Sequence, residues 1–565
     1  MELLEKYFDT AFAAPDGVQK LRELILTLAV QGKLVPQDLK EQPASELLKE
    51  IAAERQRLEK EKELRTAADE HISESEEYTG RPFGWKYCRL GNLARFIDYR
   101  GRTPEKVDSG IPLITAKNVR FGFINREPYE YITEDEYENW MTRGYPKLGD
   151  LLFTTEAPLG NIAVIDIQER FALAQRVICL QLHKPDIGSF LKWLIMSVSF
   201  QSQLLNNATG MTAKGIKSAR LKEIPIPLPP LAEQHRIVAK IDQLMARCDD
   251  LEKLRGDRNQ KRITIHTAAL DRLLTAKESN DFSTAWRFIT QHFGELYSVK
   301  ENVAELRKAI LQLAVMGKLV PQDPTDEPAS ELLKAIEAEK QRLAQTEEIK
   351  ISKPLLEIKI DEIPYELPKG WKWVRLGSIA AYIQRGIGPR YSDIPEIPVI
   401  SQKCIQWSGF NKSIVKFIDP STIDRYRNER FIRDGDLLWN STGTGTIGRI
   451  NVYRDELNEF KRVVADSHVT VIRLIGLCNA YVLNFLMSPI VQKHIEENAS
   501  GTTNQIELNT TTVINQVVPL PPLAEQRRIV AKIDQLMTLC DQLDQQIDAA
   551  TSKQTTLLNA VMAQV

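Results

Sequence analysis

Apolar side chains recur at helical spacing over residues 18–31, and the pattern predicts an amphipathic helix that Gly32 ends. A second helix is predicted after Ser45, over a charged, Ala-rich run that contains no Gly or Pro up to about residue 70. Residues 303–345 repeat both patterns. The chain therefore carries the same pair of predicted helices twice.

Two stretches of short β-branched and aromatic runs follow these helical pairs, broken by Gly, Pro and Asp turns. The first opens at Gly84 with GWKYCRLGNLA and contains GDLLF, and the second opens at Gly370 with GWKWVRLGSIA and contains GDLLW. One helix is predicted late in each stretch, near residues 187–206 and 477–497. The pattern favours two mixed α/β globules of similar size.

A long helix is predicted to leave each globule after a proline run, starting at Leu231 and at Leu523. Apolar residues of the second helix alternate by three and four, which is the seam of a coiled coil. We expect the seam of the first helix to shift or fray at Arg255 and Arg258. Each amphipathic helix needs a partner, and the obvious partner is the long helix of the other copy, running antiparallel.

Sequence identity between the two halves supports a duplication. AVQGKLVPQD at 29–38 returns as AVMGKLVPQD at 314–323, and LPPLAEQHRIVAKIDQLM at 228–245 returns at 520–537 with a single change. We predict a mixed α/β (α+β) fold in which two globules are separated by a pair of long antiparallel coiled-coil helices. A pseudo-twofold tandem duplication of this kind brings the C-terminus near the N-terminus.

Five regions follow from this organisation. They are an N-terminal helical region at 1–80, a first globule at 81–230, a central helical region at 231–365, a second globule at 366–522 and a C-terminal spacer helix at 523–565. The central region holds a long spacer helix and a segment equivalent to 1–80.

The net charge of −2 hides a partition along the chain. Residues 81–226 carry 20 Lys and Arg against 15 Asp and Glu, and residues 370–518 carry 17 against 14, so the remainder is −10. A polyanion would therefore prefer the globules. The six cysteines have neither zinc nor disulfide spacing, and no apolar run or signal peptide indicates a membrane, so we expect a cytoplasmic chain with reduced thiols.

The types of exposed polar residue predict DNA contacts, because Arg pairs with guanine, Asn and Gln pair with adenine, and Lys neutralises phosphates. In the first globule the candidates are Arg100, Arg102, Lys117, Asn118, Arg120, Lys214, Lys217 and Arg220. In the second they are Arg385, Arg390, Tyr391, Gln402, Lys403, Trp407, Asn440, Ser441, Thr444 and Arg449. The loops after the two GDLL strands, 154–161 and 440–449, differ chemically and would read different bases.

No convincing catalytic set is present in the sequence. Residues 443–449 resemble a phosphate-binding loop, but Arg449 and Ile450 stand where Lys and Ser or Thr are needed. We therefore predict no catalytic residue, metal or cofactor in this chain. Three functions remain open: a DNA-recognition subunit, a coiled-coil scaffold that binds proteins, and an autonomous nuclease or ATPase built around 443–449.

Four motifs together resemble the specificity (S) subunits of type I restriction–modification systems. They are GKLVPQD followed by PASELLK, the GW-x-x-x-RLG openings, the GDLLF and GDLLW strands, and PLPPLAEQ-x-RIVAKID. The resemblance covers essentially the whole chain. It implies two target-recognition domains, each reading one half of a bipartite, asymmetric site in double-stranded DNA, with the paired helices as a ruler.

The same resemblance implies a non-catalytic chain with partners. Two modification subunits would supply S-adenosylmethionine-dependent adenine methylation, and restriction subunits would add translocation and cleavage that use ATP and Mg. The long acidic N-terminal and central segments are expected to dock these subunits.

Overall fold

A computed structural model describes residues 12–61, 72, 82–99, 104–210, 214–349, 355–443, 445–455, 460, 462–498 and 507–563. It divides into two compact units: unit 1 comprises residues 1–258 and 550–565, and unit 2 comprises residues 259–549. The division falls inside each of the two long helices, α9 (Leu231–Thr275) and α17 (Leu523–Met562).

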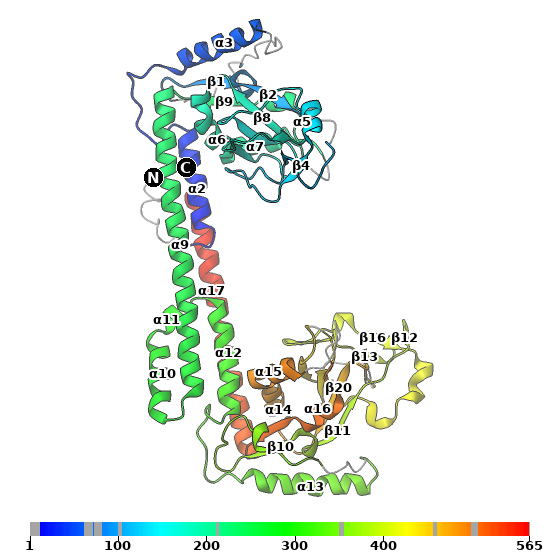
Figure 1. Ribbon diagram of the computed structural model, residues 1–565. Coiled ribbons are helices and arrows are strands. Elements are labelled where there is room, and N and C mark those ends of the chain that lie inside the picture. The colour runs from blue at the N-terminus through cyan, green and yellow to red at the C-terminus, as the bar shows by residue number, and fades with distance from the viewer. Residues whose placement is uncertain are drawn as a thin grey trace. The chain divides into compact units, whose positions relative to one another are not determined.

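The described residues of unit 1 form short helices and three small sheets (Figure 1). The helices described there, besides α9, are α2 (Gly17–Val30), α3 (Ala44–Lys60), α4 (Leu90–Leu93), α5 (Glu134–Trp140), η2 (Pro185–Ile187), α6 (Gly188–Met196), α7 (Val198–Asn206) and α8 (Ser218–Lys222). Its strands are β1 (Lys86–Arg89), β2 (Ala94–Asp98), β3 (Ile111–Ile114), β4 (Glu130–Ile132), β5 (Leu151–Thr154), β6 (Ile162–Val164), β7 (Ala172–Leu173), β8 (Val177–Leu182) and β9 (Pro225–Leu228). The sheet orders are β2-β8-β5-β6, β4-β3-β7 and β1-β9.

Unit 2 repeats this plan, and the part of it that the structure describes has four sheets, ordered β11-β20-β17-β18, β12-β16-β13-β19, β10-β21 and β14-β15. Its helices, besides α17, are α10 (Ser279–Gln291), α11 (Phe293–Leu296), α12 (Lys300–Val315), α13 (Ala329–Gln345), η3 (Ile360–Glu362), η4 (Leu376–Ser378), η5 (Lys412–Ile414), η6 (Pro420–Arg425), η7 (Asn428–Arg430), α14 (Asn479–Leu486), α15 (Pro489–Asn498) and α16 (Thr510–Asn515). Its strands are β10 (Lys372–Arg375), β11 (Ala380–Arg385), β12 (Tyr391–Ser392), β13 (Pro398–Ile400), β14 (Ile405–Gln406), β15 (Gly409–Phe410), β16 (Lys416–Ile418), β17 (Leu437–Asn440), β18 (Ile450–Val452), β19 (Val464–Ala465), β20 (Val469–Leu474) and β21 (Val517–Leu520).

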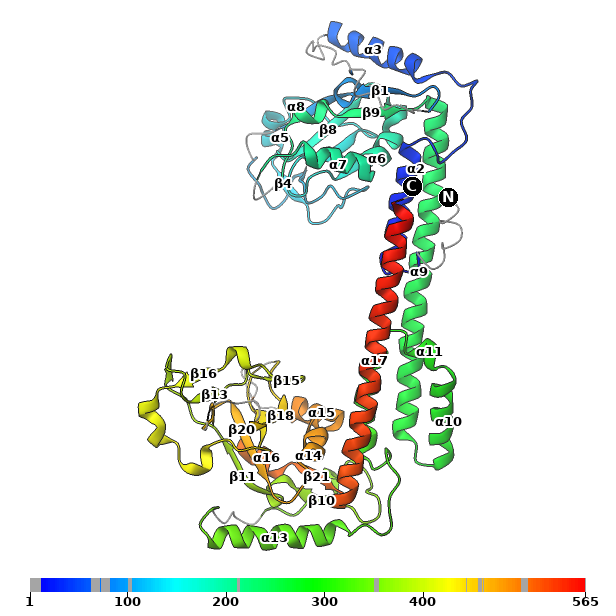
Figure 2. The same cartoon turned by 180° about the vertical axis from the view of Figure 1, so that it is seen from behind.

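The GDLL motif forms the central strand of each main sheet, and its apolar run is explained by burial on both faces. In β5, Leu151 and Phe153 enter the core beneath α6 and α7, while Leu152 points to the core shared with the β3 sheet. In β17, Leu437 and Trp439 face α14 and α15, while Leu438 faces the opposite core. Figure 2 shows α14 and α15 between the main sheet of unit 2 and α17.

The preceding Asp of the GDLL motif explains how each strand begins. The Asp150 carboxylate accepts a hydrogen bond from the Lys147 backbone N–H at 2.8 Å, and the Asp436 carboxylate accepts one from the Arg433 N–H at the same distance. Each Asp thereby closes the turn that leads into its strand.

The remaining repeated motifs meet at one buried joint in each unit. The Trp85 indole N–H donates to the Glu233 carboxylate at 3.0 Å, and the Trp371 indole N–H donates to Glu525 at 2.9 Å. Burial raises the pKa of both carboxyls, although the indole hydrogen bond opposes that rise. The GW and LAEQ motifs therefore recur because each supplies one half of this contact.

Glycine of the GKLVPQD motif is required at the same joint. Gly32 has φ +69° and Gly317 has φ +68°, a left-handed conformation that favours glycine. A Cβ on Gly32 would lie 2.4 Å from the Pro82 ring, and one on Gly317 would lie 2.4 Å from the Pro368 ring. The motif thus ends a helix and lets the joint close around a proline.

Each long helix buries its apolar stripe against a short helix of its own repeat. In unit 1, Ile237, Ile241 and Cys248 of α9 share a core with α2, and Arg22 of α2 pairs with Asp249 and Glu252 at 2.6 and 2.8 Å. In unit 2, Ile533 and Cys540 of α17 share a core with α12, and Arg307 pairs with Asp541 and Asp544 at 2.8 and 2.9 Å. The short helix is a partner that heptad spacing alone does not identify.

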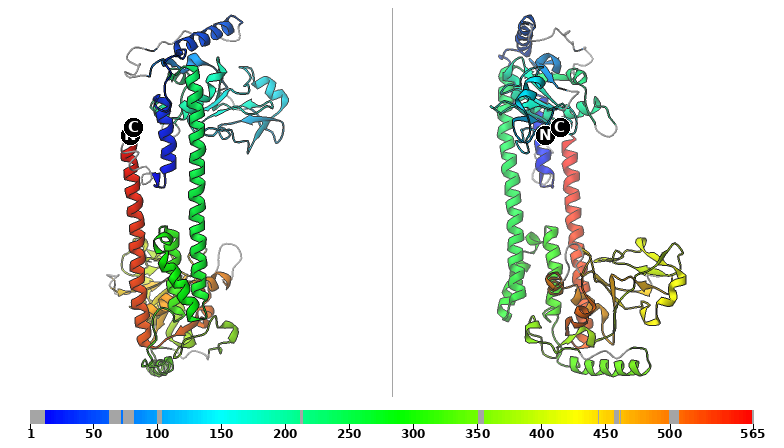
Figure 3. Two further views of the ribbon diagram at one scale, coloured as in Figure 1. Left: turned by 90° about the vertical axis from the view of Figure 1, so that its left-hand side faces the viewer. Right: turned by 45° about the vertical axis from the view of Figure 1, so that its right-hand side comes forward.

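The end of α17 belongs to unit 1, where Leu558 packs with Phe12, Ala14 and Leu24. Figure 3 shows α2 between this end of α17 and α9. The C-terminal helix and the beginning of the described chain therefore lie together, as the duplication predicts.

Helix α9 is continuous from Leu231 to Thr275, but its apolar seam is interrupted near Arg255, as predicted: no residue of 249–265 is buried, and Leu251 and Leu254 are 43% and 64% exposed. At this interruption Arg255 donates to the carbonyls of Phe12, Ala13 and Ala14. Two details correct the predicted elements. The single helix expected at 187–206 is two helices, separated at Ser197, whose side chain caps α7. The helix expected at 477–497 is likewise divided, into α14 and α15, with Ser488 between them.

Among the described residues, no helix combines the length and apolarity that crossing a membrane requires. All six cysteines are free, as expected, and Cys248 and Cys540 are buried within the helical cores.

Candidate nucleic-acid interface

Three segments of each unit lie together and carry most of the predicted DNA contacts. We call this the three-segment face; it comprises residues 115–124, 154–161 and 214–220 in unit 1, and 401–410, 440–449 and 507–510 in unit 2. Thr155 and Ser441, which follow β5 and β17, accept backbone hydrogen bonds from Ile216 and Leu508 at 3.0 and 2.7 Å. The first and second segments are joined by side chains that differ between the units.

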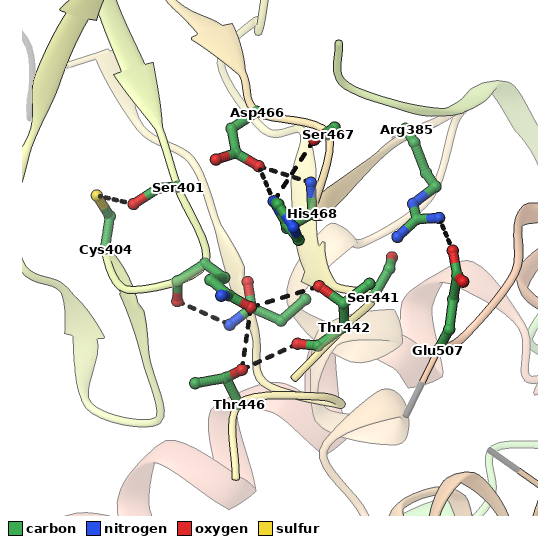
Figure 4. A network of polar contacts seen from close by, with 12 residues as sticks. Arg385, Ser401, Cys404, Ser441, Thr442, Thr446, Asp466, Ser467, His468 and Glu507 are labelled. Carbon is green, nitrogen blue, oxygen red and sulfur yellow. Dashed lines mark hydrogen bonds and ion pairs between the residues drawn. The ribbon is translucent and has the colours of Figure 1, made fainter. Parts of the chain in front are cut away.

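In unit 2 the joining residue is Gln402. Its backbone carbonyl accepts from the Asn440 side-chain amide at 2.9 Å, and its Oε1 accepts from the hydroxyls of Thr442 and Thr446 at 3.4 and 3.1 Å. Figure 4 shows Thr442 and Thr446 within this network. The loop can fold so tightly because Gly443, Gly445 and Gly448 adopt φ values of +96°, +84° and +84°.

Arg449 closes the same loop from the other end. Its guanidinium donates to the Gln406 side chain at 2.8 Å and to the Gly445 carbonyl at 2.6 Å. This loop therefore holds an arginine and a glutamine together in a fixed geometry. It provides no Lys or hydroxyl in the arrangement that a nucleotide phosphate site requires.

In unit 1 the joining residue is Asn161. Its side-chain amide donates to the Val119 carbonyl at 2.9 Å, and the Gly122 N–H donates to the Ile162 carbonyl at 2.8 Å. The 154–161 loop and the 115–124 turn are thereby fixed against each other as in unit 2, but through different side chains.

A pair of glutamines supports both loops from the helices below. Gln201 of α7 donates to the carbonyls of Gly160 and Ile195 at 3.0 and 2.7 Å, and Gln492 of α15 donates to those of Gly448 and Leu486 at 3.2 and 2.6 Å. The backbone of the two loops is thus held alike while their side chains vary.

The exposed candidates of unit 1 are basic. Lys117, Arg120, Lys214, Lys217 and Arg220 are all exposed. Lys117 lies 3.9 Å from the partly buried Glu130, and Arg220 lies 3.1 Å from the exposed Glu223; pairs whose cation is exposed in this way contribute little. These five side chains are available to a polyanion.

The exposed candidates of unit 2 include aromatic as well as basic side chains. Arg390, Tyr391, Lys403 and Trp407 are exposed, and Arg390 lies 3.5 Å from Asp419. The Tyr391 ring is covered on one side by the Lys416 ammonium at 4.8 Å. Burial, together with the nearby Asp466 carboxylate, raises the pKa of the Tyr391 hydroxyl.

Three predicted contacts are corrected by burial. Asn118 is 1% exposed, and its side chain bonds to Thr115 and to the carbonyls of Asn125 and Pro128. Asn440 and Ser441 are fully buried, and the Ser441 hydroxyl lies 2.5 Å from that of Thr470. These residues build the frame of the face, so we no longer expect them to touch DNA.

Arg385 is also engaged within the chain, because it forms an ion pair with Glu507 (Figure 4). Arg100, Arg102 and Thr444 lie outside the described residues. The sequence interpretation missed Phe121 and Phe123, which are 46% and 60% exposed beside Arg120. Two apolar rings in a polar turn were the signal that would have identified them.

No group of three or more His, Cys, Asp or Glu side chains in the described part of the chain could hold a metal ion. His468 donates from its backbone N–H to Asp466 at 2.6 Å, and its Nδ1 lies 2.8 Å from the same carboxylate oxygen (Figure 4). This contact closes the turn before β20.

Duplicated mixed α/β domains, each with a basic, loop-built face and each leading into a long helix, define a class of modular recognition protein. A family model for the type I restriction modification DNA specificity domain matches residues 82–259 and 368–550. The chain belongs to the family of type I restriction–modification specificity subunits. It is a DNA sequence-recognition subunit, and its family is one of non-catalytic subunits.

Relatives match over nearly the full length. The chain is 31% identical to the type I restriction enzyme EcoAI specificity subunit of Escherichia coli and 30% identical to the EcoEI specificity subunit of the same species. Each comparison covers 96% of this chain and 93% of the relative. A solved structure of the HsdS subunit from Thermoanaerobacter tengcongensis is 18% identical, covers 85% of this chain and 96% of its own, and has a TM-score of 0.39.

Proposed function

We propose that this chain reads a bipartite, asymmetric site in double-stranded DNA, with one recognition domain on each half-site. The observation that supports the proposal is the contrast within the three-segment face. The two units hold their loops with equivalent glutamines, Gln201 and Gln492, yet differ in the outward side chains. Two unlike half-sites require this combination of one scaffold and two readers.

The chemistry of the two faces suggests how they would divide the work. In unit 1, exposed Lys117, Lys214 and Lys217 suit phosphates, and Arg120 suits a guanine edge. In unit 2, the Oε1 of Gln402 already accepts two hydroxyl hydrogen bonds. Its amide N–H groups would therefore donate to an acceptor such as guanine O6 or thymine O4.

The long helices would set the gap between the half-sites. Helix α9 contains 45 residues and α17 contains 40. At about 1.5 Å per residue, helices of this length reach on the order of 60 Å, nearly two turns of B-DNA at about 34 Å each. A helical segment of that length is a suitable ruler for a site with a non-read spacer.

We further propose that the chain works without catalysis of its own. Two modification subunits would bind it and methylate adenine with S-adenosylmethionine, and restriction subunits would use ATP and Mg. The exposed polar faces of α3 and α13 are suitable docking surfaces for such subunits. The complex would act in the cytoplasm, where its DNA target lies.

DNA binding by the complex, titrated against salt, tests this proposal against a protein-binding scaffold. We expect affinity to fall steeply between about 50 and 200 mM salt, with competition by the specific site exceeding that by random duplex. Lys214→Ala with Lys217→Ala should lower affinity for all sequences alike and reduce the salt slope by about 2. Weak binding without salt or sequence dependence would favour the scaffold.

A further inference from the structure

An exposed aromatic ring lies at the tip of the same hairpin in both units. In unit 1, Val119 and Ile124 pair across a tight turn whose tip holds Phe121, 46% exposed, and Phe123, 60% exposed. In unit 2, β14 and β15 pair Ile405 with Phe410, and the tip holds Trp407, 46% exposed. Counted from the paired residues, Phe121 and Trp407 occupy the same position.

Both hairpins are rigidly anchored although their tips are exposed. In unit 1, Val119 accepts from Asn161 and Gly122 donates to Ile162, at 2.9 and 2.8 Å. In unit 2, the Gln406 side chain accepts from Arg449 at 2.8 Å, and its carbonyl accepts from Asn451 at 3.4 Å. A ring on such a support loses little freedom when it is bound, so the entropic cost of binding it is small.

The charge around each tip indicates what it would meet. Residues 117–126 contain Lys117, Arg120 and Arg126 and no Asp or Glu. Residues 403–412 contain Lys403 and Lys412 and again no Asp or Glu. All five cations are exposed, so each ring stands within a strip of chain whose own charges are all basic. Two of these cations lie near a carboxylate from outside the strip, Lys117 at 3.9 Å from Glu130 and Arg126 at 3.4 Å from Asp166, and such exposed pairs are weak.

Exposed apolar rings on soluble proteins mark interaction sites when they stand together with a consistent charge. An acid-free basic strip favours a nucleic acid over a protein surface, because it would bring phosphates to both sides of the ring. An aromatic ring flanked by phosphate contacts is the arrangement of side chains that wedge between stacked base pairs.

We propose that Phe121 and Trp407 are apolar wedges, each inserted at a base step of the half-site that its own domain reads. Phe123 would widen the wedge of unit 1, for which unit 2 has Gly409 in the corresponding position. This inference rests on the proposed function and adds a deformation step to it. Steps that unstack easily, such as TA and CA/TG, would then be preferred where the hairpins contact DNA.

The test uses the complete complex and duplexes in which 2-aminopurine replaces one adenine at a time in the recognised site. Fluorescence should rise at one step in each half on binding, because the probe brightens when it unstacks. Phe121→Ala should abolish the rise in one half only, and Trp407→Ala should abolish it in the other. Each should weaken binding about tenfold, the scale of one base–aromatic stack.

Matched controls are exposed aromatic residues outside the face. Tyr145→Ala in unit 1 and Trp286→Ala in unit 2, at 50% and 49% exposure, should leave both readouts unchanged. Trp407→Phe should retain the fluorescence rise. An adenine extruded by a methyltransferase also brightens, but its signal would not depend on Phe121 or Trp407.

The outcomes separate the wedge from the function on which it rests. Wild-type affinity and unchanged fluorescence in both alanine variants would overturn the wedge and leave DNA recognition intact. Loss of partner subunits from the complex, with the fluorescence rise retained, would also overturn it and make the tips protein contacts. Failure of the wild-type complex to bind the site at all would instead overturn the proposed function.

Discussion

The two recognition domains share the contacts that hold their loops and differ in the side chains that the loops expose. The Trp–Glu hydrogen bond measures 3.0 Å in unit 1 and 2.9 Å in unit 2. The glutamine after each Glu donates to a proline carbonyl, at 2.9 Å in unit 1 and 3.0 Å in unit 2. On the three-segment face, by contrast, equivalent positions carry different side chains. Arg120 of unit 1 corresponds to Gln406 of unit 2, and Asn161 corresponds to Arg449. Duplication has therefore preserved the contacts that hold the loops and changed the side chains that leave them.

One difference between the two domains lies in the buried core, at the start of the central strand, and not on the three-segment face. Asp436 is 1% exposed and receives two hydrogen bonds from the Arg473 guanidinium, at 2.8 and 2.6 Å. In unit 1 the side chains that donate to the equivalent Asp150 are neutral: the Gln181 amide at 3.1 Å and the Cys179 thiol at 3.7 Å. Burial raises the pKa of both carboxyls, and the ion pair opposes this rise only in unit 2.

Breaking that ion pair is the largest expected effect. Arg473→Ala leaves a buried carboxylate without its cation and should destabilise unit 2 by about 3–5 kcal/mol. Gln181→Ala removes a neutral partner and should cost about 1 kcal/mol in unit 1. Urea denaturation followed by hydrogen exchange in β17 and β5 compares the two.

Arg473→Gln tests the same difference by making unit 2 resemble unit 1. It should be less destabilising than Arg473→Ala, because the amide can donate to Asp436 as Gln181 donates to Asp150. Equal losses for the two substitutions would contradict this comparison of the frames.

The glycine of the repeated GKLVPQD motif should give a smaller but symmetrical effect. Gly32→Ala and Gly317→Ala each force a positive φ and a clash with a proline ring 2.4 Å away, at about 2–4 kcal/mol. Gly370→Ala is the control, since it shares the positive φ but meets nothing within 4 Å, and should cost about 1 kcal/mol. Thermal unfolding of the three variants would show whether the joint contributes alike in both units.

The pH effect of His183 in unit 1 is the smallest that we expect. Burial, followed by the charge of Arg55, lowers the pKa of His183 to about 4, whereas its counterpart in unit 2 is Ile475. A histidine that must stay neutral stabilises the folded state above about pH 6.5 and loses that contribution as the pH falls toward 4. Between pH 7 and pH 5 the loss should be about 2 kcal/mol, at about 1.4 kcal/mol per pKa unit.

Hydrogen exchange in β2 and β8 at pH 7 and pH 5 measures this loss, with His183→Ile as the matched variant. The variant should flatten the pH response of unit 1 without altering that of unit 2. A pH response that survives the substitution would assign it to another group.

Much of this architecture could be predicted from the sequence, because repetition exposes the residues that a frame needs. The start of α9 at Leu231 and of α17 at Leu523 followed from the proline run and the heptads. Burial of individual polar residues could not be predicted: Asn118 resembles a base reader in sequence, yet its amide is used by a turn. The carbonyl partners of Arg255 could not be predicted either, since they are distant in sequence.

The sequence predicted a face as a region, and its DNA contacts stay a prediction. Basic residues near the GDLL strands indicated loops that lie together in the structure, but the exposure of Phe121 depends on which turn residues point inward. Charge patterning selects a surface, and only packing decides which of its side chains are free to bind.

Exchange of one recognition domain, with the methylated sequence as readout, tests the central claim most directly. Residues 82–228 would be replaced by the corresponding domain of the EcoAI specificity subunit. This exchange moves β1 and β9 together, so that their pairing is kept, and leaves α9 unchanged from Leu231 onward. Methylation mapping in cells that carry the partner subunits should show one half-site changed, with the other half and the gap unchanged. A change in both half-sites, or none in either, would contradict the account of two independent readers on a duplicated frame.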